Sequence, residues 1–467
     1  MEQSRESKLI KNTAILSIGV FFPKLAVFIT LPILTGCLSK EEYGIYDLVL
    51  TLVSLLLPAA TLQIQTAAFR FLIESRDDLE NIKKIISNIY AFIIPTSTMV
   101  LVGLYFVLHK QAFFIRWIIC VYFLFETLLS TTRQISRGIG KNSIYATSTF
   151  VGATTQIVCV AVFVWGLDEG LAGAILALGC GEVIAFAYLT CKIKLWKYID
   201  FTMLDKKQLK RLLSYSWPMV PNSLSMWVMR VSDRFIITAM MGAVANAAYA
   251  VAYKIPSILN LAENTFNMAW QESASLASKD TDANAFYTTT FSNLYNFALG
   301  LLSLLIGSTP LLFNILVRGD YGEAYNQILI LYMAVFFFVL SSFWGALYVA
   351  FERTKSVGLT STVAAVINLG VDIALIKFIG LYAASGSTLV SYVFLCVYRI
   401  IDTRKFLSIK YNFKFIFTTI IIVMIQCIIC AQRIIILDIL NLLVGTIVFW
   451  TLNKKNLIMY AKKLWQK

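Results

Sequence analysis

Charged side chains inside otherwise apolar stretches are the residues of this chain with the greatest potential to do chemistry. Lys24 lies near the middle of the first apolar stretch. A charged group at the centre of a bilayer costs about 2.5–3.5 kcal/mol on insertion scales, unless it faces water or an opposite charge. We therefore expect Lys24 either to contact an anionic ligand in a hydrated cavity or to pair with an acidic residue of another helix.

A second group of charges, Arg230, Asp233 and Arg234, lies in the outer half of a later apolar stretch. Arg230 and Arg234 are one helical turn apart and share a face, so two guanidinium groups could contact one phosphate-rich ligand. Two alternatives remain open. Asp233 could form an ion pair with Arg230 within the helix, and Arg234 could extend its charged end to the membrane interface.

Further charges inside apolar stretches have both signs. Lys254 and Glu263 lie in the stretch that follows, and Asp372 lies in a later one. Glu126 and Glu182 are additional candidates in the first half of the chain. A polar cavity lined by several helices is the economical way to accommodate them all.

The sign of these charges indicates the ligand. A cavity for cationic drugs would need inward-facing carboxylates, whereas Lys24, Arg230 and Lys254 favour an anion. The predicted substrate-binding residues of a cationic cavity are Lys24, Arg230, Arg234 and Lys254. The predicted acidic partners or coupling residues are Asp233, Glu263 and Asp372.

No motif in the sequence points to catalysis or to a cofactor. The chain has neither a phosphate-binding P-loop nor a dinucleotide fingerprint. Cys427 and Cys430 have the spacing of a metal or redox pair but lie in an apolar run, where small-hydrophobe packing is the simpler interpretation. His109 is at a helix end, where an interfacial histidine is a simpler interpretation than a proton relay. We therefore predict no enzymatic activity, no catalytic residue, no cofactor and no metal site.

Membrane-spanning helices must position these charges. The 467 residues are 58% hydrophobic and 14% charged, and the mean hydropathy is +0.74. That much apolar surface belongs in lipid. We predict an all-α polytopic protein with about 14 transmembrane helices, because a spanning helix needs about 20 apolar residues. The predicted helices start near Asn12, Tyr43, Ile85, Ala112, Ser143, Gly170, Leu213, Ala247, Phe286, Ala324, Gly358, Tyr382, Phe413 and Ile434.

The basic residues predict the orientation of the chain. Its net charge of +14 is concentrated at helix ends, which argues against nucleic acid as a partner. Roughly 30 Lys and Arg residues fall in one set of alternate connections and about 6 in the other, so the positive-inside rule places both termini in the cytoplasm. The connection from Arg399 to Lys414 is counted in the basic set.

The arrangement of helices suggests a duplication. Six helices, a basic connection and six more helices would form two parallel repeats. We predict an N-terminal lobe at 1–195, a basic cytoplasmic linker at 196–212, a C-terminal lobe at 213–405, and two final helices with a tail at 406–467. Prolines in corresponding helices indicate a binding region, or kinks that only help packing. We predict that Pro23 and Pro32 interrupt one helix and that Pro218 and Pro221 interrupt another, while Pro58 and Pro256 fall in the helices that follow.

Several short runs resemble one family of transporters. They are Leu31 to Thr35, Glu42 to Tyr46, Trp217-Pro218 through Asp233-Arg234-Phe235, Tyr249 to Ile255, Ala269-Trp270, and Glu352 to Lys355 followed by Asn368. In order and spacing they resemble the polysaccharide repeat-unit flippases of the multidrug/oligosaccharidyl-lipid/polysaccharide exporter superfamily. Ala247 departs from the family, which usually has a glycine there, as at Gly44 in the first half.

The resemblance implies two six-helix lobes around a V-shaped central cavity with a cationic lumen, plus two C-terminal helices. It implies a carrier in the bacterial inner membrane that flips undecaprenyl-diphosphate-linked oligosaccharides to the outer leaflet for O-antigen, capsule, exopolysaccharide or lipopolysaccharide assembly. The implied partners are this polyprenyl-diphosphate-linked oligosaccharide, membrane lipids, and the polysaccharide polymerase and chain-length machinery. A lipid II flippase and a multidrug exporter of the same fold are alternatives. A membrane enzyme is disfavoured because every predicted outer loop is short.

Overall fold

The computed structural model describes residues 22–109, 111–278, 280–351 and 353–465. Within these ranges the chain forms helices and short connections, and no β-strand occurs. This is the expected outcome for a spanning chain, because lipid offers no hydrogen-bond partner to an unpaired backbone group. Eleven of the described helices are long and apolar enough to cross a membrane, and Phe22–Cys37 forms a shorter apolar helix.

The chain divides into two compact units, Met1–Trp227 and Val228–Lys467. The helices of the first unit, after Phe22–Cys37, are α2 (Lys40–Thr61), α3 (Ile64–Glu74), α4 (Leu79–Val107), α5 (Phe113–Gly138), α6 (Asn142–Cys159), η1 (Val160–Gly166), α7 (Gly170–Ile193), η2 (Leu195–Lys197), η3 (Phe201–Met203) and α8 (Lys206–Ser216). The unit boundary falls within α9 (Met219–Met241). The second unit continues with α10 (Ala243–Lys254), α11 (Ser257–Ala277), α12 (Ala283–Leu316), α13 (Gly322–Ala350), α14 (Thr354–Ile379), α15 (Leu381–Thr403), α16 (Phe413–Ala431) and α17 (Ile435–Trp465).

The polytopic helical fold predicted from the sequence is confirmed, and the described helices begin near the predicted starts. The start near Asn12 lies outside the described residues. Helix breaks follow proline less closely than predicted. Pro256 does separate α10 from α11, but the break between α2 and α3 falls at Leu62 and Gln63, which adopt left-handed backbone angles.

Other prolines do not interrupt their helices. Pro58 stays inside α2, and Pro32 lies within the continuous helix Phe22–Cys37. Pro218 falls in the turn between α8 and α9, whereas Pro221 sits in the first turn of α9, where no intrahelical N–H is required. The predicted interruptions at Pro32 and Pro221 are therefore wrong, because a spanning helix tolerates proline when neighbouring groups satisfy its freed carbonyl.

Small residues bring helices of the first unit together. Helix α7 packs against α5 and α6. A Cβ atom built on Gly152 of α6 would lie 3.2 Å from the carbonyl oxygen of Gly181 in α7, and one built on Gly181 would lie 3.1 Å from that of Gly152. Without a hydrophobic driving force in lipid, such close backbone approach supplies the packing energy between helices.

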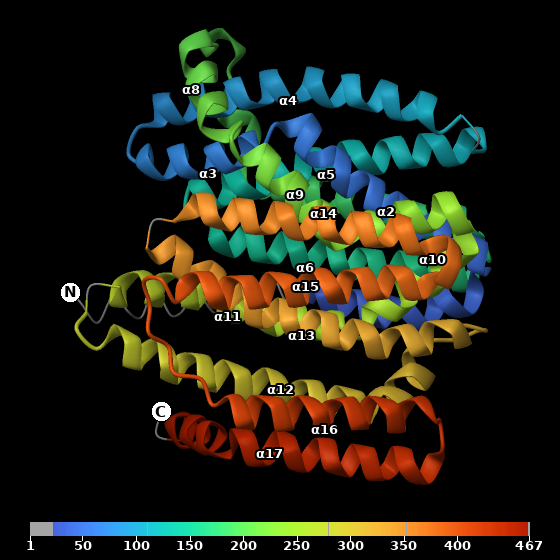
Figure 1. Cartoon of the computed structure of the whole chain (residues 1–467). Helices are drawn as coiled ribbons and strands as arrows, with labels where there is room; N and C mark the ends of the chain where they lie inside the picture. Colours follow the sequence, from blue (N-terminus) through green and yellow to red (C-terminus); the bar gives the residue numbers. More distant parts are fainter. Residues whose placement is uncertain (1–21, 110, 279, 352, 466–467) are drawn as a thin grey trace. The chain divides into compact units, whose positions relative to one another are not determined.

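In the second unit, α13 is the most buried helix. It contacts α10, α11, α14 and α15, and 78% of its most apolar window is buried. Helices α12, α16 and α17 lie side by side (Figure 1). A Cβ atom on Gly307 of α12 would lie 2.6 Å from the carbonyl oxygen of Asn441 in α17, so glycine is required at this contact. Helix α13 therefore packs against α10, α14 and α15, which carry polar residues of the candidate site.

Candidate functional site

A buried carboxylate lies at the centre of the second unit. Asp233 of α9 is buried, and its Oδ2 atom accepts hydrogen bonds from the Tyr249 hydroxyl of α10 at 2.7 Å and from the Thr388 hydroxyl of α15 at 2.8 Å. Three helices therefore converge on one carboxylate oxygen. The other oxygen, Oδ1, is buried and has no hydrogen-bond partner among the described residues.

Helix α14 brings a second carboxylate to the same place. Asn368 and Asp372 are one turn apart on α14, and both are fully buried. Asp372 lies within electrostatic range of Asp233, and Asn368 lies beside the Asp233 carboxylate. The Asn368 amide donates to the Ser387 hydroxyl at 3.2 Å. We call Asp233, Asn368, Asp372 and Thr388 the oxygen cluster.

The oxygen cluster has more acceptors than donors. Four buried oxygen atoms have no hydrogen-bond partner within the described part of the chain, namely Asp233 Oδ1, Asn368 Oδ1, and both carboxylate oxygens of Asp372. A buried acceptor without a partner costs about 1–3 kcal/mol, and more when it is charged. Buried charges are normally paired or bound to cations. The arrangement is therefore suited to receive a small cation.

The oxygen atoms available as ligands also limit the charge of that cation. No three His, Cys, Asp or Glu side chains gather to form a metal-binding group among the described residues. Two carboxylates with a neutral amide and a hydroxyl balance one or two positive charges. Arg234 already supplies one charge near Asp233, which favours a singly charged ion over a divalent one.

The two predicted arginines of α9 differ in accessibility. Arg230 is exposed, and its guanidinium lies 5.2 Å from the centre of the Phe338 ring of α13. Arg234 is buried, with its guanidinium 5.5 Å from the Tyr253 ring. Because Asp233 is hydrogen-bonded to Tyr249 and Thr388, its carboxylate is held by neighbouring helices. Of the two arginines, Arg230 is exposed and can reach a ligand, whereas Arg234 is buried.

The remaining predicted site residues occupy separate places. Lys24, in the first unit, is exposed on the helix Phe22–Cys37. Lys254 is half-buried in the last turn of α10, directly before the break at Pro256. Glu263 of α11 is buried and borders a small recess among apolar side chains. Of the acidic set, the structure brings together Asp233 and Asp372.

Helix α9, which crosses the unit boundary, and helix α11 of the second unit carry charged residues within a spanning length. Helix α9 has 23 residues and would extend about 34 Å, and α11 has 21 residues, so each is long enough to span a bilayer. Neither belongs to the eleven helices that are apolar enough to do so. Their polar faces must therefore be shielded by protein or water. This is the behaviour expected of helices that line a hydrated path.

One buried cation was missed in the sequence, and its assignment was wrong. Arg399 was counted in a basic connection, but it lies inside α15 and is 5% exposed. Its guanidinium donates to the Ser341 carbonyl oxygen at 3.0 Å and to the hydroxyls of Thr360 and Ser361 at 3.2 and 3.1 Å. A Cβ on Gly345 would lie 2.8 Å from Arg399 Nη1, so the glycine makes room for it.

Thr388 and Tyr249 were also not predicted as site residues. Hydroxyl side chains are frequent in spanning helices, and nothing in their local sequence distinguishes these two.

In the first unit, Glu182 of α7 lies close to Glu126 and to Arg133 of α5. That group places two acids and one base inside a single unit, and its two glutamates are half-buried, whereas the carboxylates of the oxygen cluster are buried.

The fold matches those of solved transporters. An outward-facing multidrug resistance MATE family transporter of the MOP superfamily has a TM-score of 0.61 and 14% identity, over 85% of this chain and 94% of that one. An inward-facing form has a TM-score of 0.69 and 13% identity, over 84% and 97%. A MOP superfamily transporter from Pyrococcus furiosus, described as having a binding pocket of reverse polarity that suggests a different function, has a TM-score of 0.59 and 14% identity, over 84% and 94%.

These similarities define the class of the protein, which is a multi-pass helical membrane protein with the fold of MOP superfamily transporters. At such low identity they establish the fold alone. The family model for polysaccharide biosynthesis proteins matches residues 9–271, more than half of the chain. The chain therefore belongs to the polysaccharide biosynthesis protein family. Among curated protein sequences, none matches it.

Proposed function

We propose that this protein flips polyprenyl-diphosphate-linked oligosaccharide repeat units from the cytoplasmic to the outer leaflet of a bacterial inner membrane, by alternating access. The observation that carries the proposal is the exposed guanidinium of Arg230, in a helix of spanning length, in a member of the polysaccharide biosynthesis family. An exposed cation in such a helix requires water or an anion. A diphosphate-linked sugar supplies the anion.

The energetics favour this substrate over an uncharged one. A diphosphate and its sugars lose hydration when they leave the headgroup region, and Arg groups replace that hydration with charge-assisted hydrogen bonds. The polyprenyl tail can stay in lipid during the passage. We assign Arg230 and Lys24 to contact the substrate, and Lys254 and Arg234 to raise the positive potential of the path. No covalent bond changes in this process.

We further propose that the oxygen cluster couples transport to a small cation, either Na⁺ or a proton. Its buried oxygens without donors support this role. The cluster is built from α9, α14 and α15, with a hydrogen bond from Tyr249 of α10, and α9 also carries Arg230. A cation that draws these helices together would therefore change the position of Arg230. Glu263 is not part of this group, and we assign it a role as an acidic partner of the cavity.

The same fold could serve a multidrug exporter, since two of the similar structures are multidrug resistance transporters. The Pyrococcus furiosus protein supports a distinction by pocket polarity within this fold. Exposed basic residues favour an anionic substrate over a cationic drug. Lipid II is chemically close to the proposed substrate, because it is also a polyprenyl diphosphate with attached sugars, so the experiment must include it.

The test is a reconstituted translocation assay. Purified protein in proteoliposomes is supplied with a fluorescent undecaprenyl-diphosphate oligosaccharide, with lipid II, or with a cationic dye, and movement between leaflets is measured. We expect the oligosaccharide lipid to move and Arg230→Gln to slow it by about tenfold or more, the effect of a charge-assisted contact of about 1.5–3 kcal/mol. Lys410→Gln removes an exposed charge from the same unit and should leave the rate unchanged.

The assay separates the alternatives. Transport of dye without transport of either lipid would replace the proposal with drug export. Faster movement of lipid II than of the oligosaccharide lipid would reassign the substrate to peptidoglycan synthesis. A rate that is equal in Arg230→Gln, Lys410→Gln and wild type would remove Arg230 from the substrate path. Two further experiments test the remaining proposals. Labelling of single cysteines placed near each terminus tests the proposed cytoplasmic location of both ends. Co-purification of the protein with a polysaccharide polymerase and chain-length machinery tests the proposed partners.

A further inference from the structure

A pocket rich in lysine lies in the first unit, and none of its lining residues is among those assigned above. It is a partly open cavity of about 480 Å³, lined by Leu79, Lys83, Lys141, Ile193, Lys194, Lys197 and Tyr198. We call it the lysine pocket. Its volume lies within the range of about 300–1,000 Å³ that is usual for small-ligand sites. Four of the seven lining residues are lysines, and none is acidic.

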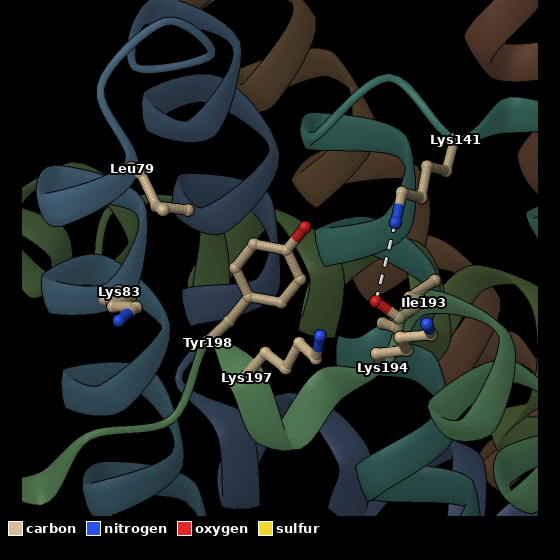
Figure 2. A pocket seen from close by; sticks show the side chains of 7 residues that line it. All are labelled: Leu79, Lys83, Lys141, Ile193, Lys194, Lys197 and Tyr198. Carbon is tan, nitrogen blue, oxygen red and sulfur yellow. Dashed lines mark hydrogen bonds between the residues drawn. The ribbon is translucent and has the colours of Figure 1, made fainter.

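The four lysines come from separate elements. Lys83 belongs to the first turns of α4, and Lys141 precedes α6. Lys194 ends α7 with a left-handed backbone, which turns the chain into η2 and brings Lys197 to the same side. In Figure 2, Lys83 lies across the pocket from Lys141 and Lys194, with the Tyr198 ring between them.

Packing holds part of the pocket in place. The Lys141 ammonium donates to the Ile193 carbonyl oxygen at 3.4 Å, as the dashed line in Figure 2 shows, and it lies 5.9 Å from the centre of the Tyr198 ring. Beside the pocket, the Asp200 carboxylate accepts hydrogen bonds from the backbone and side chain of Thr202 and lies within electrostatic range of Lys83. Asp78 and Glu80 flank Leu79 in the chain, but no carboxylate is among the seven lining residues, so the lining itself carries only positive charge.

Exposed apolar side chains accompany the lysines. Leu79, Trp196, Phe201 and Leu204 are each about half exposed or more, at 59%, 57%, 55% and 49%. A tryptophan and a phenylalanine between lysines are typical of a segment that lies at the boundary between headgroups and acyl chains. Lysine stems can follow the apolar surface while their ammonium groups reach the phosphates. The pocket is therefore placed to receive a membrane lipid rather than a solute from bulk water.

We propose that the lysine pocket binds the phosphate headgroup of an anionic glycerophospholipid. The ammonium groups of Lys83, Lys194 and Lys197 would contact the phosphate oxygens, and the acyl chains would run beside Leu79 and Trp196. Basic pockets at the ends of spanning helices recognise anionic headgroups by this chemistry. The orientation proposed from the basic connections assigns this end to the cytoplasmic leaflet. The binding is separate from the transported substrate and does not depend on its identity.

The experiment compares lipid retention by three forms of the full-length protein. Wild type, the pocket variant Lys83→Gln/Lys194→Gln/Lys197→Gln, and the control variant Lys206→Gln/Lys207→Gln/Lys210→Gln are purified in neutral detergent. The control removes the same charge from exposed positions of the neighbouring helix α8. Each is titrated with phosphatidylglycerol or phosphatidylcholine and examined by native mass spectrometry. Lys141 is left unchanged because its ammonium group donates a hydrogen bond to the Ile193 carbonyl oxygen.

We expect wild type and the control to retain phosphatidylglycerol in preference to phosphatidylcholine, and the pocket variant to bind phosphatidylglycerol at least about tenfold more weakly, as expected from the loss of three lysine–phosphate attractions. Phosphatidylglycerol should also raise the melting temperature of wild type and of the control only, since a ligand of the folded state stabilises it. Lys197→Glu provides a second test at a single exposed position. It should weaken phosphatidylglycerol binding without changing circular dichroism.

Three results would overturn the proposal. Equal loss of phosphatidylglycerol in the pocket and control variants would indicate a general effect of net charge. Equal retention of phosphatidylcholine and phosphatidylglycerol by wild type would show that the site does not distinguish their headgroups. Stabilisation of wild type by sodium glycerol phosphate to the same extent as by phosphatidylglycerol would make the ligand a soluble phosphate, with no role for the acyl chains.

Discussion

The oxygen cluster of the second unit and the lysine pocket of the first unit gather polar groups in opposite ways. The oxygen cluster places carboxylate and amide oxygens in a fully buried position, without enough donors. The lysine pocket places ammonium groups at an open end of its unit, beside exposed aromatic side chains. Burial makes an unbalanced charge expensive, whereas exposure lets water screen it. Substitutions in the oxygen cluster should therefore have much larger effects.

Arg399 shows what a buried charge requires when it is fully satisfied. Its guanidinium has three oxygen acceptors inside the second unit, whereas Asp372 has no donor among the described residues. We interpret the first as structural and the second as functional. A satisfied group stabilises one conformation, and a group that lacks donors becomes stable only when a ligand arrives.

The largest effect should come from Arg399→Met. Methionine fills much of the space but removes the donor that Arg399 supplies to the Ser341 carbonyl and to two hydroxyls, so we expect a loss of about 3 kcal/mol in stability. The measurement is the thermal unfolding of purified protein in detergent. Lys405→Met, at an exposed position six residues further on, is the control. An unchanged melting temperature in Arg399→Met would show that this buried network contributes nothing.

Asp372→Asn should abolish coupling while leaving the fold intact. The variant keeps the shape and removes one charge, so the dependence of transport on Na⁺ or on the proton gradient should fall by about 5–150-fold, the usual range of coupling between two sites. Transport is measured with NaCl against choline chloride, and with and without a pH gradient. Glu323→Gln, an exposed acid of α13, is the matched control. Coupling that persists in Asp372→Asn would exclude the oxygen cluster as the cation site.

Thr388→Val should have an intermediate effect. It removes the hydroxyl that donates to Asp233 Oδ2 at 2.8 Å, while Tyr249 continues to donate at 2.7 Å. One lost hydrogen bond corresponds to about 1 kcal/mol, or about fivefold in apparent cation affinity. The cation concentration that gives half-maximal transport is measured. Thr418→Val is the comparison, because the Thr418 hydroxyl bonds only its own helix at Lys414, and the two variants should differ.

The smallest effect should come from a partly exposed ion pair near the lysine pocket. Lys84 Nζ lies 2.6 Å from Asp205 Oδ2, and this hydrogen bond is the main reason why the pKa of Asp205 is below its ordinary value. The contribution is present above the unfolded pKa of about 3.9 and is lost as pH falls through the lower folded value. Lys84→Gln should lower the melting temperature slightly at pH 7 and not at pH 2, with the difference erased by about 1 M salt. A large change at pH 7 that salt does not reduce would indicate another role for Lys84.

Predictions from the sequence succeeded where a local property decides the structure. The membrane location and the helices follow from apolar runs, since each run must pair its own backbone groups in lipid. The charged positions Arg230, Asp233, Arg234 and Asp372 are visible in the sequence because each lies within an apolar run, but their roles in binding or coupling stay predictions. The family resemblance was confirmed by the match to residues 9–271.

The sequence by itself determined that this is a polytopic membrane protein of the polysaccharide biosynthesis protein family, and which of its charges lie within apolar runs. Only the tertiary structure decided that Asp233 meets Thr388, a residue 155 positions away, and that Arg399 lies buried in a helix rather than in a basic connection. Hydropathy is a property of each segment. The rotation of one helix against another depends on all the packed side chains together, so no local pattern of residues reveals which oxygen atoms will share a site.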